Sequence, residues 1–276
     1  MTRCFIIGHP IAHSRSPLIH GEWLRQHGLD GSYERVDVAP TDLPRFFERL
    51  RANEFAGGNV TVPHKEAVMP HLDVIGPAAL AIGAVNTLWW EDGKLHGDNT
   101  DAFGFLAHLD ATVPGWDQQA STALILGAGG AARAIVYALK ERGLSQITIV
   151  NRNRDRADDL VAAFGSPLLA GDWAARETEV ERADLIVNTT SLGMHGQPPL
   201  DLDLSRLRPG AVVNDIVYVP LDTPLLAAAK RHGGHPVDGL GMLLHQAIPG
   251  FARWFGVRPQ VTMALRQKIE HDLGPR

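Results

Sequence analysis

A glycine-rich turn in the middle of the chain is the first feature with the residues for chemistry. It runs Gly-Ala-Gly-Gly-Ala-Ala-Arg over residues 127–133. The apolar run 122–126 before it predicts a buried strand, and the apolar-periodic stretch 134–139 predicts a helix. The first glycine allows a tight turn, the second lets the backbone approach a pyrophosphate, and the small Ala132 allows close packing of helix and strand. The pattern predicts a dinucleotide phosphate site at a helix N-terminus.

The end of the next predicted strand indicates which dinucleotide would bind. An NAD site normally has an acidic residue at this tip, which accepts from the ribose 2′-hydroxyl. Here no acid stands at the tip, and the sequence is Asn151-Arg152-Asn153-Arg154-Asp155-Arg156. Arginines suit a 2′-phosphate and can stack on adenine. They could instead only solvate the start of a helix, but a cation there opposes the helix dipole. The cluster therefore predicts NADP.

Three polar clusters in the first part of the chain supply the other candidates. They are residues 8–17, 57–66 and 82–87, the last continued by 97–104, and each lies at a predicted strand end or turn. Reduction of a ketone by hydride needs a proton for the developing alkoxide, which a partly desolvated lysine held by an aspartate can give. Lys65 and Asp101 are of the right types. Ser14 and Ser16 suit a ligand carboxylate, and ligand hydroxyls suit three further side chains: Asn59, Thr61 and Asn86.

Each of these clusters also has a purely structural interpretation. A lysine after Pro-His is usually a solvated helix start, and Ser-x-Ser-Pro is usually a turn with a helix N-cap. A single cluster would favour that interpretation, and His64 beside Lys65 is expected only to shape its turn. The co-occurrence of all three clusters favours a site.

The elements that must position these residues form two domains of ordinary size in a chain of 276 residues. In the first part, strands are predicted at 4–7, 33–38 and 55–62, a hairpin at 84–90 and 94–96, and helices at 18–27, 43–51 and 101–109. A polar stretch, 111–120, is the expected linker. After it, strands at 122–126, 147–150, 185–187 and 211–213 alternate with helices, which predicts a parallel, doubly wound sheet. The tail is helical at 240–255 and 260–271, and we expect it to pack back on the first domain.

Composition narrows the class of protein. The apolar fraction is 45%, the charged fraction 21% and the net charge −5, with no basic stripe, so neither nucleic acid nor a membrane is an expected partner. Residues 1–8 predict a first strand and no signal peptide. The single cysteine, Cys4, fits a reducing cytoplasm. His9 and His13 are separated by Pro10, and there is no His-Glu-x-x-His pattern, so no metal is expected.

Taken together and in order, these segments resemble the shikimate dehydrogenase family over nearly the whole chain. The resemblance includes the segments named above and the following further motifs: Asn188-Thr189-Thr190-Ser191-Leu192-Gly193-Met194, residues 215–218, and Asp238-Gly239-Leu240-Gly241-Met242-Leu243-Leu244-His245-Gln246. It implies an α/β protein with an N-terminal substrate-binding domain, residues 1–110 and 240–276, and a Rossmann-type NADP-binding domain, residues 111–239. The implied reaction is the reversible, NADPH-dependent reduction of 3-dehydroshikimate to shikimate in aromatic amino acid biosynthesis. A cytoplasmic monomer or homodimer is expected.

The resemblance also implies roles for individual residues. The catalytic pair falls on Lys65 and Asp101. Substrate contacts fall on Ser14, Ser16, Asn59, Thr61, Asn86, Asp101, Tyr218 and Gln246. Cofactor contacts fall on Gly127, Ala128, Gly129, Gly130, Ala131, Asn151, Arg152, Asn153, Arg154, Arg156, Thr189, Ile216 and Gly239. The family has Asn-Arg-Thr at the strand tip where this chain has Asn151-Arg152-Asn153, and an asparagine can still donate to a phosphate.

Two alternatives remain open from the sequence. One is a quinate/shikimate dehydrogenase that uses either nicotinamide, because one extra hydroxyl is hard to reject by pocket shape alone. The other is a regulatory binding protein that kept the fold and lost catalysis. Such a protein is expected to lack a reactive pair, whereas Lys65 and Asp101 are both present.

Overall fold

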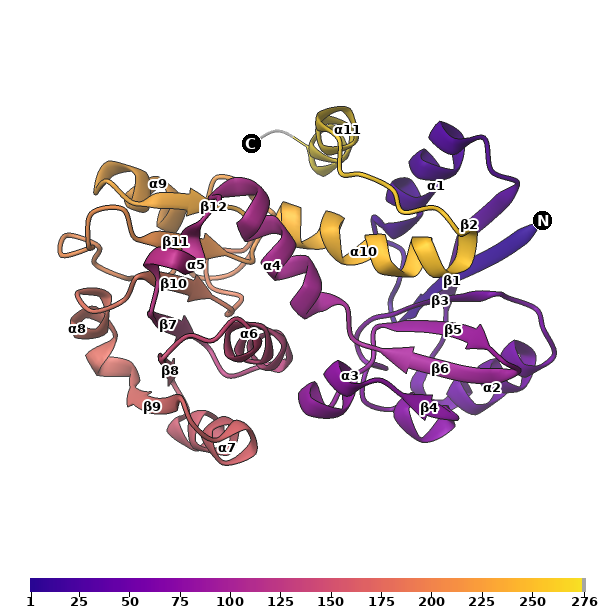
Figure 1. The fold of residues 1–276 in the computed structure, drawn as a ribbon, viewed down its shortest axis with the longest axis horizontal. Helices are drawn as coiled ribbons and strands as arrows, with labels where there is room; N and C mark the ends of the chain where they lie inside the picture. Colours follow the sequence, from indigo (N-terminus) through magenta and orange to yellow (C-terminus); the bar gives the residue numbers. More distant parts are fainter. Residues whose placement is uncertain (275–276) are drawn as a thin grey trace. The chain divides into compact units, whose positions relative to one another are not determined.

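The computed structural model describes residues 1–274, which form two compact units. Unit 1 contains Met1–Asp101 and Leu244–Gly274, and unit 2 contains Ala102–Leu243. The division falls at the first residue of helix α4 (Asp101–Thr112) and inside helix α10 (Leu240–Phe255), both labelled in Figure 1. The last two residues of the expected domain segment 240–276 lie outside the described residues. None of the helices between residues 1 and 274 has the length and apolarity needed to cross a membrane.

Unit 1 is built on a mixed six-stranded sheet in the order β2-β1-β3-β5-β6-β4. Strand β1 runs parallel to both β2 and β3, β5 is antiparallel to β3 and to β6, and β6 is parallel to β4. The strands are β1 (Thr2–Gly8), β2 (Gly31–Asp37), β3 (Gly57–Val60), β4 (Val74–Ile75), β5 (Thr87–Glu91) and β6 (Lys94–Asp98). The carboxyl ends of β1 and β3 therefore lie at one edge of the sheet. The first polar cluster starts at the end of β1, and the second contains β3 and the turn after it.

Alternation along β1 gives unit 1 two cores, one on each face of the sheet. Phe5 and Ile7 belong to a core with side chains of α2 (Leu43–Arg51), including Phe46. Cys4 and Ile6 point the other way, into a cluster with Tyr33 and Trp254. The remaining helices of unit 1 are α1 (Ser16–His27), α3 (Pro77–Ile82) and α11 (Met263–Leu273). Because Trp254 comes from α10, the tail of the chain contributes to the second core.

Unit 2 contains a six-stranded, wholly parallel sheet in the order β12-β11-β10-β7-β8-β9. Numbered within the unit, this is the 3-2-1-4-5-6 order of the doubly wound dinucleotide fold, with its switch point between β7 and β10. The strands are β7 (Thr122–Leu126), β8 (Gln146–Asn151), β9 (Leu168–Asp172), β10 (Leu185–Asn188), β11 (Val212–Asp215) and β12 (His235–Val237). The helices between them are α6 (Gly130–Glu141), α7 (Arg154–Phe164), α8 (Arg176–Val180) and α9 (Pro224–Arg231). The predicted α/β class with a doubly wound second sheet is confirmed.

The segment expected to be a linker is instead packed into unit 2. It holds a short helix, α5 (Trp116–Gln119), and Trp116 is only 3% exposed. The Trp116 indole donates to Asp110, and the Arg142 guanidinium lies 5.6 Å from the centre of its ring. The polar composition of the segment concealed this single buried aromatic anchor. Strands β4, β9 and β12 also had no counterpart in the prediction, because each is short and has little alternation.

Candidate active site

Lys65 and Asp101 form an ion pair in unit 1. Lys65 lies in the turn after β3, and Asp101 is the first residue of α4, three residues after β6. The Lys65 ammonium donates to Asp101 Oδ2 at 2.6 Å, and the two side chains are 29% and 17% exposed. Both backbones are held: Val85 N donates to the Lys65 carbonyl at 2.7 Å, and Asp101 N donates to Asn99 Oδ1 at 2.9 Å. The pair is therefore fixed in place yet open to a ligand.

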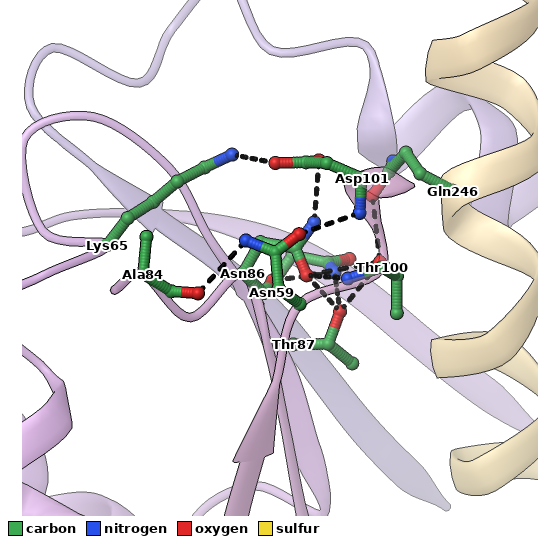
Figure 2. A network of polar contacts seen from close by, with 9 residues as sticks. Asn59, Lys65, Ala84, Asn86, Thr87, Thr100, Asp101 and Gln246 are labelled. Carbon is green, nitrogen blue, oxygen red and sulfur yellow. Dashed lines mark hydrogen bonds and ion pairs between the residues drawn. The ribbon is translucent and has the colours of Figure 1, made fainter. Parts of the chain in front are cut away.

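The second oxygen of Asp101 is held by Asn86 (Figure 2). Asn86 Nδ2 donates to Asp101 Oδ1 at 2.7 Å. The carbonyl oxygen of the same amide accepts from Thr100 N at 2.9 Å and from the hydroxyls of Thr87 and Thr100 at 2.8 and 3.1 Å. These donors fix which end of the amide faces Asp101. Only one N–H of Asn86 Nδ2 donates to another of the described residues, so its second N–H is available to a ligand.

Asn59 lies beneath this site and is 4% exposed. Its Nδ2 donates to the backbone carbonyl of Asn86 at 3.0 Å and to Thr87 Oγ1 at 3.1 Å. Its Oδ1 accepts from the Tyr33 hydroxyl at 2.6 Å. Both amide hydrogens are thus used within the protein, so only a lone pair of Oδ1 is left for a ligand. Gln246, from α10, joins the network through the Thr100 hydroxyl at 3.5 Å.

The predicted carboxylate-binding serines lie at the start of α1. Ser16 N donates to Ser14 Oγ at 3.3 Å, and Ser16 is buried. Thr61 follows β3 directly, and its backbone N–H donates to Ile7 of the neighbouring strand β1 at 2.9 Å. His64 Nε2 donates to the Val38 carbonyl at 2.6 Å, so the side chain of His64 connects the turn before Lys65 to the segment after β2.

The predicted cofactor residues follow the carboxyl ends of five parallel strands in unit 2. Residues 127–131 follow β7, 151–156 follow or end β8, Thr189 follows β10, Ile216 follows β11 and Gly239 follows β12. All five strands point the same way, so these segments share the edge of the sheet at which doubly wound folds bind ligands. Tyr218 lies in unit 2 with them.

The glycine-rich turn has room for a pyrophosphate. Gly127 has φ +103°, and a Cβ there would lie 2.7 Å from Thr189 Oγ1, so this position requires glycine. A Cβ at Gly129 or Gly130 would meet no heavy atom of the described residues within 4 Å. Gly130 begins α6, whose first N–H groups have no intrahelical partners. Open space over these free donors fits the phosphates of a dinucleotide.

The arginines at the tip of β8 differ from one another. Arg154 is paired with Asp158 at 3.0 Å and Asp172 at 2.7 Å. Arg152 and Arg156 are exposed, and neither forms an ion pair with another of residues 1–274. Asn153 accepts from Asp155 N at 3.0 Å and so caps α7. Arg152 and Arg156 are thus the better placed of the three to meet a 2′-phosphate.

A buried carboxyl group, which the sequence interpretation placed in a motif without giving it a role, supports the loops after β10 and β11. Asp215 accepts from Asn188 Nδ2 at 2.9 Å, Val217 N at 3.1 Å and Thr223 Oγ1 at 2.8 Å. Burial raises the pKa of Asp215 above its ordinary value, against these donors. The residues Asn188 and Asp215 are opposite each other in neighbouring strands. They hold the segments that carry Thr189 and Ile216.

Hydrogen bonds therefore connect only some of the predicted site residues. The network of Figure 2 joins Asn59, Lys65, Asn86, Asp101 and Gln246. Ser16 lies near this network, because its side chain interacts with the Tyr33 hydroxyl, which donates to Asn59. Ser14 and Thr61 lie in the same unit, Ser14 just before α1 and Thr61 just after β3. Sequence reasoning assigned no role to Thr87, Asn99 or Thr100. All three stand within the polar clusters, so their position was a signal, although their partners were not readable.

The chain matches two family models. Residues 6–88 match the shikimate dehydrogenase substrate binding domain, and residues 111–194 match the shikimate / quinate 5-dehydrogenase model. A protein of Azorhizobium caulinodans named shikimate dehydrogenase (NADP(+)) is 55% identical over 276 residues, covering 100% of this chain and 98% of the relative.

Solved structures agree over the full length. Shikimate 5-dehydrogenase of Thermus thermophilus, in complex with NADP(H) and shikimate, is 38% identical with a TM-score of 0.87, covering 99% of this chain and 100% of the other. Quinate dehydrogenase of Corynebacterium glutamicum, in complex with NAD, is 30% identical with a TM-score of 0.89, covering 97% and 98%.

Proposed function

The chain belongs to the shikimate dehydrogenase family, and we propose that it catalyses the reversible, NADP-dependent interconversion of shikimate and 3-dehydroshikimate. The observation that carries the proposal is the Lys65–Asp101 pair, joined at 2.6 Å within the unit that holds the residues matched to the substrate-binding model. A regulatory protein without catalysis has no need of this pair.

Lys65 is the general acid and base in this proposal. Bound NADPH supplies a hydride to the carbonyl carbon of 3-dehydroshikimate. As the carbonyl oxygen becomes an alkoxide, Lys65 gives it a proton from Nζ, and in the oxidation direction Nζ takes the proton from the shikimate hydroxyl. Asp101 keeps Nζ directed to that oxygen through Oδ2, and Oδ1 stays bound to Asn86. Lys65 then exchanges its proton with solvent, to which it is 29% exposed.

The substrate is held by the side chains that the family pattern predicts for this role. Ser14 and Ser16 bind the carboxylate, because two hydroxyl donors next to each other suit its two oxygens. The remaining hydroxyls contact Asn86, through its free N–H, and Asp101, together with Thr61, Gln246, Tyr218 and the free lone pair of Asn59 Oδ1. In this proposal the substrate-binding domain is the part of the expected segments 1–110 and 240–276 that lies in unit 1, Met1–Asp101 and Leu244–Gly274.

The segment 111–239 is the NADP-binding domain in this proposal. Residues Gly127 to Ala131 line the pyrophosphate, and the backbone N–H groups at the start of α6 donate to it. The N–H groups of Gly127 and Ala128 already donate to Val150 and Asn151 and hold the turn in place. Arg152 and Arg156 bind the 2′-phosphate, with Asn151, Asn153 and Arg154 around them. Thr189, Ile216 and Gly239, which follow β10, β11 and β12, would be further contacts to the cofactor. The cytoplasm, where NADPH and a reduced Cys4 are both expected, is the proposed location.

A four-way assay tests the function. Purified protein is given shikimate or quinate with NADP or NAD, and formation of reduced nicotinamide is followed by absorbance. We expect kcat/KM to be highest for shikimate with NADP. A preference for quinate or for NAD would favour the dual-specificity alternative. No turnover with any of the four pairs, in a protein that binds NADPH, would favour a binding protein.

A further inference from the structure

A chain of side-chain hydrogen bonds leads from the core of unit 1 to the catalytic pair. The Tyr33 hydroxyl donates to Asn59 Oδ1 at 2.6 Å, and Asn59 Nδ2 donates to Thr87 Oγ1 at 3.1 Å. Thr87 Oγ1 donates to Asn86 Oδ1 at 2.8 Å, and Asn86 Nδ2 donates to Asp101 Oδ1 at 2.7 Å. Asn59, Thr87 and Asn86 each accept one of these hydrogen bonds and donate the next, so the series runs in one direction, from the Tyr33 donor to the Asp101 acceptor.

The direction of the chain decides how Asn86 meets Asp101. A carboxylate only accepts, so the amide must present Nδ2 to it. The amide can do this only while its oxygen is satisfied by donors on the other side. Thr87 supplies one of these donors because its own oxygen is already occupied as an acceptor by Asn59. Thr100 supplies the others, from its backbone N–H and hydroxyl.

Tyr33 starts the chain because its hydroxyl donates to Asn59. Burial holds the pKa of the Tyr33 phenol well above its ordinary value, so the hydroxyl keeps its proton. Its ring is fixed by stacking on the His20 imidazole, with centroids 4.0 Å apart and planes 11° apart. The backbone oxygen of Asn86 accepts from Asn59 Nδ2 at 3.0 Å. If the Asn59 amide were flipped, Asn59 Oδ1 would face that backbone oxygen, and two acceptors would meet. The Tyr33 donor opposes that flip.

The three middle residues of this series of hydrogen bonds are buried. Asn59, Thr87 and Asn86 are 4%, 1% and 3% exposed. Water can hardly replace a lost partner at these depths, and an unmade hydrogen bond there is costly. The removal of one hydroxyl is therefore expected to reorient the amides further along the chain.

We propose that Tyr33 and Thr87 are positioning residues for catalysis: they set the donor direction that makes Asn86 present its amide N–H to Asp101, and so fix the carboxylate that orients Lys65. This inference rests on the proposed function, since it requires Lys65 and Asp101 to be the catalytic pair. Neither residue needs to touch the substrate or the cofactor.

The test compares Thr87→Val, Thr87→Ser and Tyr33→Phe with the wild type. Valine keeps the shape of threonine and removes the hydroxyl, whereas serine keeps the hydroxyl. We expect Thr87→Val to lower kcat about 10- to 100-fold, the size of effect that a displaced catalytic group produces. Thr87→Ser should keep kcat within about twofold of wild type, and Tyr33→Phe should lower it about 5- to 20-fold. Binding of NADPH, read by fluorescence titration, should be unchanged in all three.

Trp254→Phe provides the matched control. The Trp254 indole lies next to Tyr33, with ring centroids 5.9 Å apart, and donates to the Leu88 carbonyl at 2.9 Å. The substitution removes a buried hydrogen bond from the same core but leaves every hydrogen bond between Tyr33 and Asp101 in place. It should lower the melting temperature while kcat stays within about twofold.

Two results would overturn the inference. One is a wild-type kcat in both folded Thr87→Val and Tyr33→Phe. The other is an equal loss of kcat in Tyr33→Phe and Trp254→Phe, which would mean that any weakening of this core lowers activity. If Thr87→Val does not fold, Tyr33→Phe decides, because it removes one oxygen atom and leaves the ring stack. Failure of the proposed function would look different, since the wild type itself would not oxidise shikimate.

Discussion

The two units prepare their candidate sites in different ways. In unit 1, side chains hold one another: Lys65, Asp101 and Asn86 are joined by hydrogen bonds of 2.6 and 2.7 Å over a buried layer of Asn59 and Thr87. In unit 2, the cofactor edge is made of backbone. Its glycines are open, and two of its three arginines are exposed and have no ion pair among residues 1–274.

The difference follows from what each site must do. A proton donor has to be aimed at one atom, and a buried network fixes its direction before the substrate arrives. A dinucleotide is long and highly charged, so many weak contacts along a strand edge suffice, and its own phosphates can order the arginines. We therefore expect substitutions in unit 1 to act on kcat, and substitutions at the cofactor edge to act on the KM for NADP.

Lys65→Ala should produce the largest effect. Loss of a general acid and base typically lowers the rate about 10²- to 10⁴-fold. We expect kcat to fall by that factor while NADPH binding, measured by fluorescence titration, stays intact. Asp101→Asn should lower kcat as well and raise the KM for shikimate. The losses should not add in the double variant, because the two residues act as a unit. Additive losses would mean that they work separately, and near-normal kcat in Lys65→Ala would contradict the mechanism.

Arg152→Ala tests the cofactor edge. Loss of a charge-assisted hydrogen bond of about 1.5–3 kcal/mol should raise the KM for NADP roughly 10- to 150-fold and leave the KM for NAD nearly unchanged. Arg154→Ala is the matched control, because Arg154 already pairs with Asp158 and Asp172 and should matter less. Equal effects of Arg152→Ala on both cofactors would remove the argument for a 2′-phosphate contact.

Alanine substitutions of Gly129 in unit 2 and Gly58 in unit 1 test the difference between the two units. Gly129 has φ −97° and open space around it, so alanine should leave the free energy of unfolding unchanged or raise it by up to ~1 kcal/mol. The KM for NADP should rise roughly tenfold, because the added methyl group occupies the place of the pyrophosphate.

In unit 1, a Cβ at Gly58 would lie 2.3 Å from the Phe5 carbonyl oxygen. Gly58→Ala should therefore destabilise by about 1–3 kcal/mol or more. Denaturant unfolding and KM measured on both variants separate the two roles.

The sequence predicted the parts whose signal is local. Strand β7, the glycine turn and helix α6 were readable from apolar runs and glycines. The polar clusters around Lys65, Asn86 and Asp101 could be named because they interrupt that pattern. The sequence could not reveal that both amide hydrogens of Asn59 donate to groups within the protein. It also could not reveal that Arg154 forms ion pairs with Asp158 and Asp172. Those facts depend on residues that are far apart in the chain and meet only in the fold. Trp116 was missed because the polar residues around it in the sequence predict an exposed segment.

Lowering the pH should reduce the stability of unit 1 more than that of unit 2, because His20 lies in unit 1. This effect is smaller than those of the substitutions above. Burial lowers the pKa of His20 to about 3, against the opposing effect of the nearby Asn59 side chain. Neither ring nitrogen has a hydrogen-bond partner among the described residues. The unfolded chain takes up a proton below the ordinary histidine pKa of 6.5, whereas the folded protein takes it up only near pH 3. Stability is therefore present above pH 6.5 and is lost as the pH falls through this window, at ~1.4 kcal/mol per pH unit.

Amide hydrogen exchange at pH 7 and pH 5, corrected for intrinsic rates, can read this loss in each unit. We expect unit 1 to lose about 2 kcal/mol between these values. In unit 2, burial would raise the pKa of Asp184, but donors from Ser121 and Thr122 outweigh it and lower the pKa, so its stabilising contribution is lost only below the ordinary value of 3.8. His20→Phe keeps the stack on Tyr33, replaces two unsatisfied nitrogens and should abolish the difference between pH 7 and pH 5 in unit 1. An unchanged pH dependence in that variant would show that another group causes the loss.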